Sequence, residues 1–209
     1  AGCEAAILAA ERGHSVRLVE KSGRIGGQLH AWAAASPFRM EVTNMIHFYE
    51  SELERVAVDV QLNTDATDID LAPWDTVLLA TGTVAQNQGP DVADMLANAA
   101  LPVADEVTVF GETETAMFAA LWLAEQGKKV SLLSPADGVG IDTNDMQRDH
   151  LSGLLNSLDV SIRTAVAAPG DGYVVMATAR NASTVLASTV DDIRVHSIGT
   201  RPRGGRMDE

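Results

Sequence analysis

The sequence predicts an α/β protein built from two Rossmann-like parallel-sheet halves in tandem, with the second half inserted in the first. Helix-like segments alternate with short β-branched runs, a pattern typical of parallel sheets covered by helices. The chain also repeats itself, because a shift of 114 positions aligns Glu11 with Glu125 and Gly13 with Gly127. This repeat indicates two copies of one structural unit.

In the first half, the apolar positions of CEAAILAAERG predict a helix that ends at Gly13, and HSVRLVEK predicts a strand directly after it. A long amphipathic helix is expected over residues 40–56. The runs VDVQL at residues 58–62 and DTVLLATG at residues 75–82 predict two further strands.

The second half has the same order. A strand at residues 107–110 leads through the turn GETET into the helical segment AMFAALWLAEQG, and the strand KKVSLL follows. A helix is expected over residues 144–158, and VSIRT, YVVMAT and DIRVHSIG predict three more strands. The expected boundaries are residues 1–85 for the first half, 86–102 for a linker, 103–190 for the second half and 191–209 for the return to the first.

Charge and composition exclude several classes of function. The net charge of −14 argues against nucleic acid and anionic membranes as partners, because both are bound by basic patches. No apolar run approaches the 18 residues of a membrane span.

The single cysteine, Cys3, excludes an internal disulfide and a Cys pair for zinc or redox chemistry, and it favours a reducing, cytoplasmic location. The histidines lack metal-ligand spacing, so no metal site is expected.

A glycine fingerprint for phosphate binding stands at the start of the second half. In a dinucleotide-binding unit, a strand leads into the turn G-x-G-x-x-G/A, and a helix begins there with its backbone amides facing the pyrophosphate. Gly111, Thr113 and Ala116 occupy the three positions. The repeat aligns Ala116 with Gly2, which is therefore expected to be the third glycine of a first fingerprint. Its strand and first two glycines are expected before residue 1.

Three further places could contact a bound dinucleotide. Glu20 ends the next strand and suits the ribose hydroxyls, although a solvated glutamate at a strand end would have the same signature. The loop with Gly27 and Gln28 could lay backbone amides along a cofactor, or it could be a plain flexible turn. LLATGT, which contains Thr81, could bring backbone to a ligand or could simply end a strand.

Together these motifs resemble a known family. E-K-x-x-x-x-G-G-Q after a Rossmann strand, L-x-A-T-G at the end of the first half and a second nucleotide-binding half are similar to flavoproteins with two dinucleotide-binding domains. GGQL and the helix IHFYESELER resemble more closely the C-terminal FAD/NAD(P)-binding region of old-yellow-enzyme-like NADH:flavin oxidoreductases. That group includes 2,4-dienoyl-CoA reductase and trimethylamine dehydrogenase. The resemblance covers essentially the whole chain.

The resemblance implies an FAD-dependent oxidoreductase, with residues 1–85 as the FAD-binding domain and residues 103–190 as an NAD(P)-binding-like domain. No catalytic side chain is implied, because the flavin itself transfers hydride and electrons. The implied cofactor-binding residues are Gly2 near the pyrophosphate, Glu20 on the ribose, Lys21 beside it, Gly27 and Gln28 along the cofactor, Ala66 near the adenine, Thr81 and Gly82 by the dinucleotide, and Gly111 and Ser134 in the second half.

The resemblance also implies parts that these residues do not carry. Members of the group have an N-terminal barrel with FMN, a 4Fe-4S cluster and the substrate site, whereas this sequence has no group of cysteines that could hold such a cluster. The chain is therefore expected to be a fragment of a longer enzyme. Its expected partners are dinucleotide cofactors, the N-terminal barrel domain and, as in amine-dehydrogenase-like members, an external electron-transfer protein.

The second fingerprint departs from the family pattern. Thr113 puts a side chain where the backbone should approach the pyrophosphate, and Glu112 and Glu114 put carboxylates in a turn that should receive an anion. Ser134 stands where an acid would bind an NAD ribose. NADH, NADPH and no nicotinamide at all therefore remain open for this half.

Two functions follow from this sequence. In the first, FAD in the first half relays electrons between NAD(P)H at the second half and a flavin and iron–sulfur substrate domain. In the second, the chain is a non-catalytic ADP- or FAD-binding or docking module with a degenerate nicotinamide site. A third reading, a single-domain methyltransferase-like Rossmann fold, does not explain the repeat.

Overall fold

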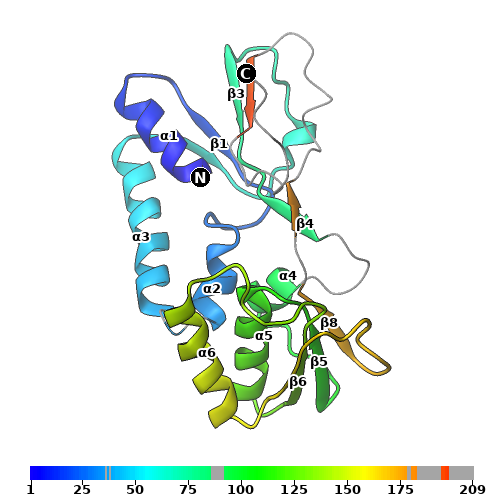
Figure 1. Ribbon diagram of the computed structural model, residues 1–209. Coiled ribbons are helices and arrows are strands. Elements are labelled where there is room, and N and C mark those ends of the chain that lie inside the picture. The colour runs from blue at the N-terminus through cyan, green and yellow to red at the C-terminus, as the bar shows by residue number, and fades with distance from the viewer. Residues whose placement is uncertain (36, 38, 86–91, 178–179, 183–193, 198–209) are drawn as a thin grey trace, which may run out of the picture. The chain divides into compact units, whose positions relative to one another are not determined.

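The computed structural model describes residues 1–35, 37, 39–85, 92–177, 180–182 and 194–197 (Figure 1). The chain forms two compact units, the first from residues 1–27, 43–84 and 181–209 and the second from residues 28–42 and 85–180. The chain leaves the first unit and later returns to it. The predicted insertion of a second Rossmann-like half in the first is therefore confirmed.

The first unit contains two pairs of parallel strands. In one pair Leu18 lies opposite Val60, and in the other Val77 lies opposite Val195. The pairs are β1 (Arg17–Val19) with β2 (Asp59–Gln61), and β3 (Thr76–Leu79) with β10 (Arg194–Ser197). Because β10 pairs with β3, the predicted final strand lies in the first unit.

Helices α1 (Gly2–Glu11) and α3 (Arg39–Arg55) accompany these strands, with the 3-10 helix η1 (Ala66–Asp68) after β2. The predicted first helix and the helix expected over residues 40–56 are thus present. The core of this unit contains a small cluster of buried apolar residues, Ala6, Ile7, Ile25 and Leu53.

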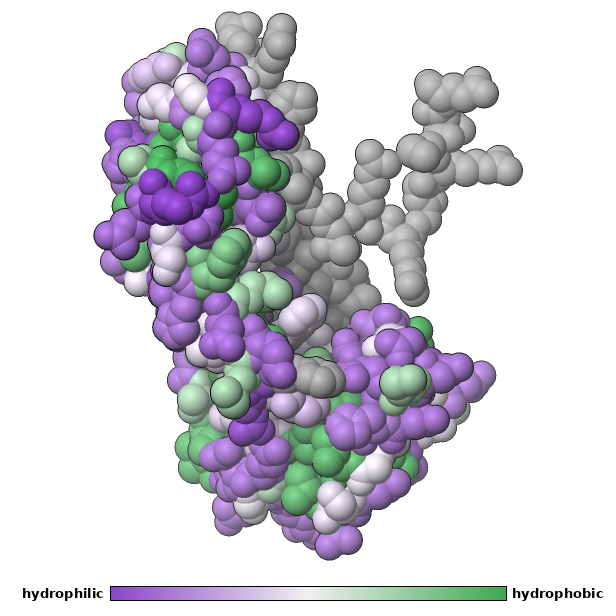
Figure 2. All heavy atoms as spheres, turned by 90° about the vertical axis from the view of Figure 1, so that its left-hand side faces the viewer, coloured by the Kyte–Doolittle hydropathy of each residue, from purple (hydrophilic) through white to green (hydrophobic). Residues whose placement is uncertain are grey.

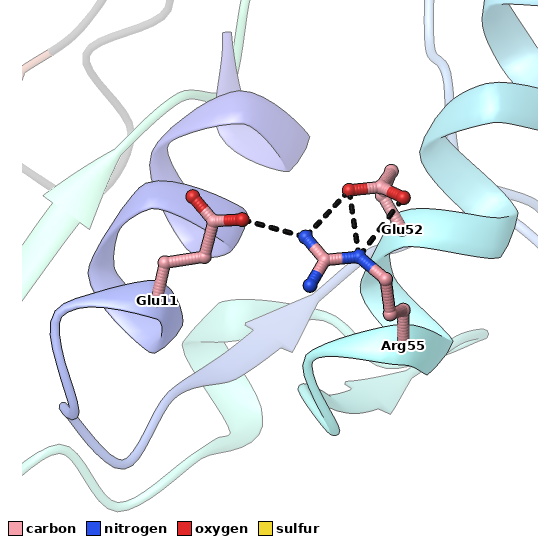
Figure 3. Close-up of polar contacts among 3 residues, drawn as sticks. All are labelled: Glu11, Glu52 and Arg55. Atoms are coloured by element: carbon pink, nitrogen blue, oxygen red, sulfur yellow. Dashed lines mark hydrogen bonds and ion pairs between the residues drawn. The ribbon is translucent and has the colours of Figure 1, made fainter.

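A branched ion pair connects α1 to α3 (Figure 3). The Arg55 guanidinium donates to both carboxylate oxygens of Glu52 at 2.7–3.0 Å, and its Nη2 donates to Glu11 Oε1 at 2.5 Å. These hydrogen bonds, first to Glu52 and then to Glu11, raise the pKa of Arg55 above its ordinary value, and Arg55 lowers the pKa of Glu52. One guanidinium fork therefore joins the end of each helix.

The second unit contains a four-stranded parallel sheet in the order β7-β6-β5-β8. In its centre Val109 lies opposite both Leu132 and Val175. The strands are β5 (Glu106–Phe110), β6 (Lys129–Leu133), β7 (Ser161–Arg163) and β8 (Val174–Met176). This arrangement is the parallel sheet that the sequence predicted for the second half.

The helix α5 (Glu114–Glu125) is buried along most of its length and packs on β5 and β6. The helix α6 (Asp145–Ser157) lies beside it (Figure 1) and begins at Asn144, whose side chain accepts a hydrogen bond from the Gln147 amide at 2.9 Å. An N-cap of this kind satisfies one of the free amides at a helix start. The helix predicted over residues 144–158 is therefore present.

Two short helices were not predicted. They are α2 (Leu29–Ala35) and α4 (Val92–Ala97), which pack on each other and on α5. The helix α4 lies in the stretch expected to be a linker, whose residues 86–91 fall outside the described residues. It forms because Val92, Met95 and Leu96 share one buried face. Packing of α2 on α4 and α5 also places residues 28–42 in the second unit, whereas the sequence boundaries put them in the first.

Strand β4 (Thr83–Ala85) pairs with β9 (Arg180–Ala182). The chain passes from one unit to the other between residues 84 and 85, and back between residues 180 and 181. The predicted return segment, residues 191–209, is described only at residues 194–197. The assignment of FAD to residues 1–85 and of NAD(P) to residues 103–190 remains a prediction.

Hydrophilic residues cover most of the face seen in Figure 2, and hydrophobic residues form separate patches on it. The exposed apolar side chains of α3 include Met40 and Phe48, which are 76% and 55% exposed. Among the residues that the structure describes, no helix has both the length and the apolar character needed to cross a membrane.

The position of Gly111 leaves no room for a side chain. A Cβ built there would lie 2.2 Å from the carbonyl oxygen of Ala177. We expect Gly111→Ala to lower the free energy of unfolding by about 2 kcal/mol or more, because the backbone beside β8 must move. Urea unfolding followed by circular dichroism measures the change.

The control is Gly153→Ala in α6, where no atom lies within 4 Å of a built Cβ. A helical alanine is favoured over glycine, so we expect this variant to gain about 0.5–1 kcal/mol. Equal unfolding midpoints for the two variants would contradict the assignment of Gly111 to a close backbone approach.

The Arg55 fork supports a second prediction. Arg55→Met should lower the urea midpoint, and the loss should be larger at low salt, because exposed ion pairs are screened. Arg55→Lys keeps the charge without the planar fork and should recover only part of the loss. Arg12→Met, which removes the same charge from the end of α1, should leave the midpoint nearly unchanged. An equal effect at Arg12 would assign the loss to net charge alone.

Candidate functional site

The predicted residues of the first unit gather where its parallel strands end. Glu20 directly follows β1, and Thr81 lies two residues after β3. A Cβ built on Gly2, the first residue of α1, would lie 3.2 Å from Ala80 Cβ, so the start of this helix meets the chain just past β3. In open α/β sheets, ligands bind beyond the carboxyl ends of the strands.

The start of α1 has no side-chain cap. Its N-cap residue is Ala1, and the first intrahelical hydrogen bond runs from the Ala5 amide to the Ala1 carbonyl at 3.0 Å. The amides of the first turn precede that bond. A helix start with free amides and a positive dipole end is suited to a phosphate group.

Glu20 is held in place at the end of β1. Its amide donates to the Gln61 carbonyl at 2.9 Å, and its own carbonyl accepts from the Thr64 amide at 3.1 Å. Its carboxylate Oε1 accepts the Ser22 amide at 2.8 Å. Within the described part of the chain, the second carboxylate oxygen has no hydrogen-bond partner. The geometry therefore leaves an acceptor at the strand end.

Lys21 contacts the segment around Ala66. Its Nζ lies 2.8 Å from Asp65 Oδ2, while Asp65 Oδ1 accepts the amide and hydroxyl of Thr67 at 3.0 and 2.8 Å. These contacts, with Lys21 as the largest, hold the pKa of Asp65 at about 2. The structure thus brings Lys21 together with the loop that was predicted to lie near an adenine.

The glycine loop after β1 lies against the first turn of α1. Gly26 lies beside the Cys3 side chain, and burial of Cys3 raises the pKa of its thiol. Gly27 has a φ of 51° and no atom within 4 Å of a built Cβ, so its backbone is open. Gly82 also has left-handed backbone, with a φ of 70°.

Gln28 falls in the second unit by its contacts. It lines a small hollow formed by α2, α4 and α5, together with Ala31, Trp32, Ala93, Leu96, Thr115 and Phe118. In the first unit, the contacts place Gly2 beside Ala80 and Lys21 on Asp65, next to Ala66. The binding of a cofactor by the predicted residues stays a prediction.

The fingerprint turn of the second unit has the predicted strand–turn–helix geometry. The Gly111 amide donates to the Leu133 carbonyl at 2.9 Å, and the Thr113 hydroxyl donates to the Ala177 carbonyl at 3.0 Å. Glu112 Oε2 is a buried oxygen without a hydrogen-bond partner among the described residues. The turn is therefore closely packed and carries an uncompensated acceptor.

Asp142 is a residue that the sequence reasoning missed. Its carboxylate Oδ1 accepts the amide of Glu114, the first residue of α5, at 2.7 Å. The signal that could have revealed it is the repeat, since a shift of 114 positions aligns Asp142 with Gln28.

Ser134 lies at the end of β6, where it was predicted, but its side chain is fully buried. The hydroxyl donates to the Gly138 carbonyl at 2.6 Å and accepts the Ala136 amide at 3.1 Å. It thus holds the loop after β6, and a ribose could not reach it in this structure. Its contact with a cofactor stays a prediction.

The fold defines a protein with two Rossmann-like units. The chain belongs to the family described as flavin containing amine oxidoreductase, whose model matches residues 1–151. Its class is therefore that of the flavin-dependent oxidoreductases.

Individual proteins support this assignment. The NADH oxidase of Thermoanaerobacter brockii is 34% identical over 178 residues, which is 78% of this chain and 27% of that protein. The N,N-dimethylglycine/sarcosine dehydrogenase of Chromohalobacter salexigens is 48% identical over 84 residues, 39% of this chain and 12% of that protein. A 2-naphthoyl-CoA reductase structure matches with a TM-score of 0.83 at 26% identity, over 94% of this chain and 34% of that one.

These matches confirm the resemblance to old-yellow-enzyme-like flavoproteins and the predicted fold class. The chain spans about a quarter of the length of the NADH oxidase.

The Lys21–Asp65 pair predicts a measurable titration. Because the pKa of Asp65 lies at about 2, below its ordinary 3.8, the pair stabilises the fold above pH 3.8, and this effect is lost as the pH falls through about 2. Lys21→Met should raise the pKa of Asp65, and Lys21→Arg should keep it low. Carboxyl-carbon NMR measures both values, and an unchanged pKa in Lys21→Met would assign the shift to Thr67 instead.

Proposed function

We propose that this chain is the FAD-binding and NAD(P)-binding-like part of an oxidoreductase that relays electrons between NAD(P)H and a flavin and iron–sulfur substrate domain. The observation that carries the proposal is the position of two residues at the carboxyl ends of the parallel strands of the first unit: Gly2 lies beside Ala80, just past β3, and Glu20 directly follows β1. The similarity to an NADH oxidase supports the electron source.

The residues of the first unit fit an FAD molecule. The uncapped start of α1 at Gly2 would receive the pyrophosphate, and the free oxygen of Glu20 would accept a ribose hydroxyl. The loop at Ala66 would lie by the adenine, with Thr81 and Gly82 along the dinucleotide. The flavin supplies hydride and electron transfer, while the protein groups bind and orient it.

The first unit would be completed by a strand from before residue 1. In the second unit β5 lies between β6 and β8 and pairs with both. The strands of the first unit that correspond to β6 and β8 are β1 and β3, and these belong to two separate pairs. A parallel strand between them, ending in the first two fingerprint glycines, would join the two pairs into one sheet. The N-terminal barrel with FMN and a 4Fe-4S cluster, and a cytoplasmic location, belong to this proposal as well.

A second candidate function is a docking module with a degenerate nicotinamide site. The contact of Asp142 with the Glu114 amide and the burial of Ser134 favour it. In that case the first unit would hold ADP or FAD, and an electron-transfer protein would take the place of NAD(P)H.

Flavin spectroscopy on the full-length protein distinguishes the two functions. The relay requires bound FAD that is bleached by NADH or NADPH, and a colourless protein that binds neither cofactor would overturn it. A variant with glycine at position 113 and glutamine at positions 112 and 114 tests the second function. Unchanged nicotinamide affinity and reduction rate in that variant would favour the docking module.

Glu20 provides the sharpest test of the FAD site. We expect Glu20→Ala to weaken FAD binding about 10-fold or more, because a hydrogen bond to a charged acceptor contributes about 1.5–3 kcal/mol. FAD content after gel filtration, separated from FMN by chromatography, measures the loss. Glu54→Ala removes the same charge from the exposed surface of α3 and should retain FAD. Equal FAD content in both variants would remove Glu20 from the site.

A further inference from the structure

The start of α5 is occupied by a carboxylate from the same chain. The Glu114 amide is the first of this helix, and it donates to Asp142 Oδ1 at 2.7 Å. In a dinucleotide-binding unit, the amides of this turn face the pyrophosphate. Asp142 therefore supplies an anion at a position where a phosphate oxygen would be bound.

The loop that carries Asp142 is fastened to the fingerprint turn. The Ile141 amide donates to the Glu112 carbonyl at 3.1 Å, and the Thr143 hydroxyl donates to Glu114 Oε1 at 3.0 Å. With the contact from Asp142, three hydrogen bonds connect residues 141–143 to residues 112–114. Asp142 is thus held in place over the turn, although its side chain lies at the surface.

Arg148 holds the same loop from the side of α6. Its guanidinium donates to the carbonyls of Gly140 and Thr143, each at 3.2 Å. Gly140 has a φ of 61°, a conformation that favours glycine, and a Cβ there would lie 2.7 Å from Met117 Sδ. The loop conformation that presents Asp142 is therefore set by a glycine and an arginine.

The first unit has the same loop without the carboxylate. The repeat aligns Gly140 with Gly26 and Met117 with Cys3, and each loop lies against the first turn of the helix that precedes it, Gly26 beside Cys3 of α1 and Gly140 beside Met117 of α5. Asp142 aligns with Gln28, a neutral residue, and α1 has no side-chain cap. The two units thus share one framework and differ in the charge placed at the helix start.

We propose that Asp142 determines the affinity of the second unit for nicotinamide dinucleotides by competing with their pyrophosphate. It occupies the first amide of α5, and its charge repels phosphate together with that of Glu112, whose Oε2 is buried without a partner among the described residues. A dinucleotide binds only when the loop of residues 140–143 moves away. The inference rests on the proposed origin of this unit as an NAD(P)-binding domain.

Two substitutions in the full-length protein separate the two effects of Asp142. Asp142→Asn removes the charge and keeps an oxygen that can cap α5, so this variant is expected to fold even if Asp142→Ala does not. Asp142→Ala removes both. We expect Asp142→Ala to lower the dissociation constant of NADH or NADPH about 10-fold, and Asp142→Asn to lower it by a smaller factor. Titration of nicotinamide fluorescence measures both constants.

Asp149→Asn is the matched control, because it removes a carboxylate from the exposed surface of α6 in the same unit. Its dissociation constant should equal that of the unchanged protein. Hydrogen exchange of residues 112–116 gives an independent reading, since the Glu114 amide should exchange faster in Asp142→Ala and regain protection when NADH is added.

The role of Asp142 would be overturned if the unchanged protein and Asp142→Ala had equal dissociation constants for NADH or NADPH. It would also be overturned if neither protein bound these dinucleotides. An equal gain in Asp149→Asn would also overturn it, because net charge would then explain the effect. FAD content is measured on the same samples. Loss of FAD from all of them would count against the proposed function, whereas intact FAD with unchanged nicotinamide affinity would count against Asp142 alone.

Discussion

Both units depend on one close approach, in which the start of a helix lies against the chain just past a parallel strand. A Cβ at Gly111 would lie 2.2 Å from the Ala177 carbonyl oxygen, and one at Gly2 would lie 3.2 Å from Ala80 Cβ. A larger residue would separate helix from sheet at that point. The approach brings the first amides of α1 and α5 to the sheet edge where ligands bind.

The same framework gives the two helix starts opposite electrostatic character. At α1 the amides are uncapped and Glu20 stands at the next strand end, an arrangement suited to a phosphate and a ribose. At α5 the amide of Glu114 is bonded to Asp142, and Ser134 is buried where the ribose acid would stand. The backbone geometry therefore gives both units the Rossmann-like fold, while a few side chains determine whether the start of the helix can bind an anion.

The two units are also stabilised differently. The second unit has a continuous four-stranded sheet and a core in which Met117, Leu123 and Val109 are fully buried. The first unit has two separate strand pairs and a small buried cluster, and the fork from Arg55 to Glu11 and Glu52 adds a polar connection between its helices. Because exposed ion pairs contribute little and burial of apolar area contributes most of the stability, the second unit is the better supported of the two.

Residue periodicity and glycine spacing are local properties, so the two repeated units, most of their helices and strands and the positions of Gly2, Glu20 and Gly111 in them could be predicted from the sequence. The helices α2 and α4 could not be predicted in this way, because their short apolar faces are stabilised by packing on each other. Nor could the burial of Ser134 and the contact between Glu114 and Asp142, which are 28 residues apart. Such contacts depend on how loops fold back over a helix start, and no local pattern of residues encodes that.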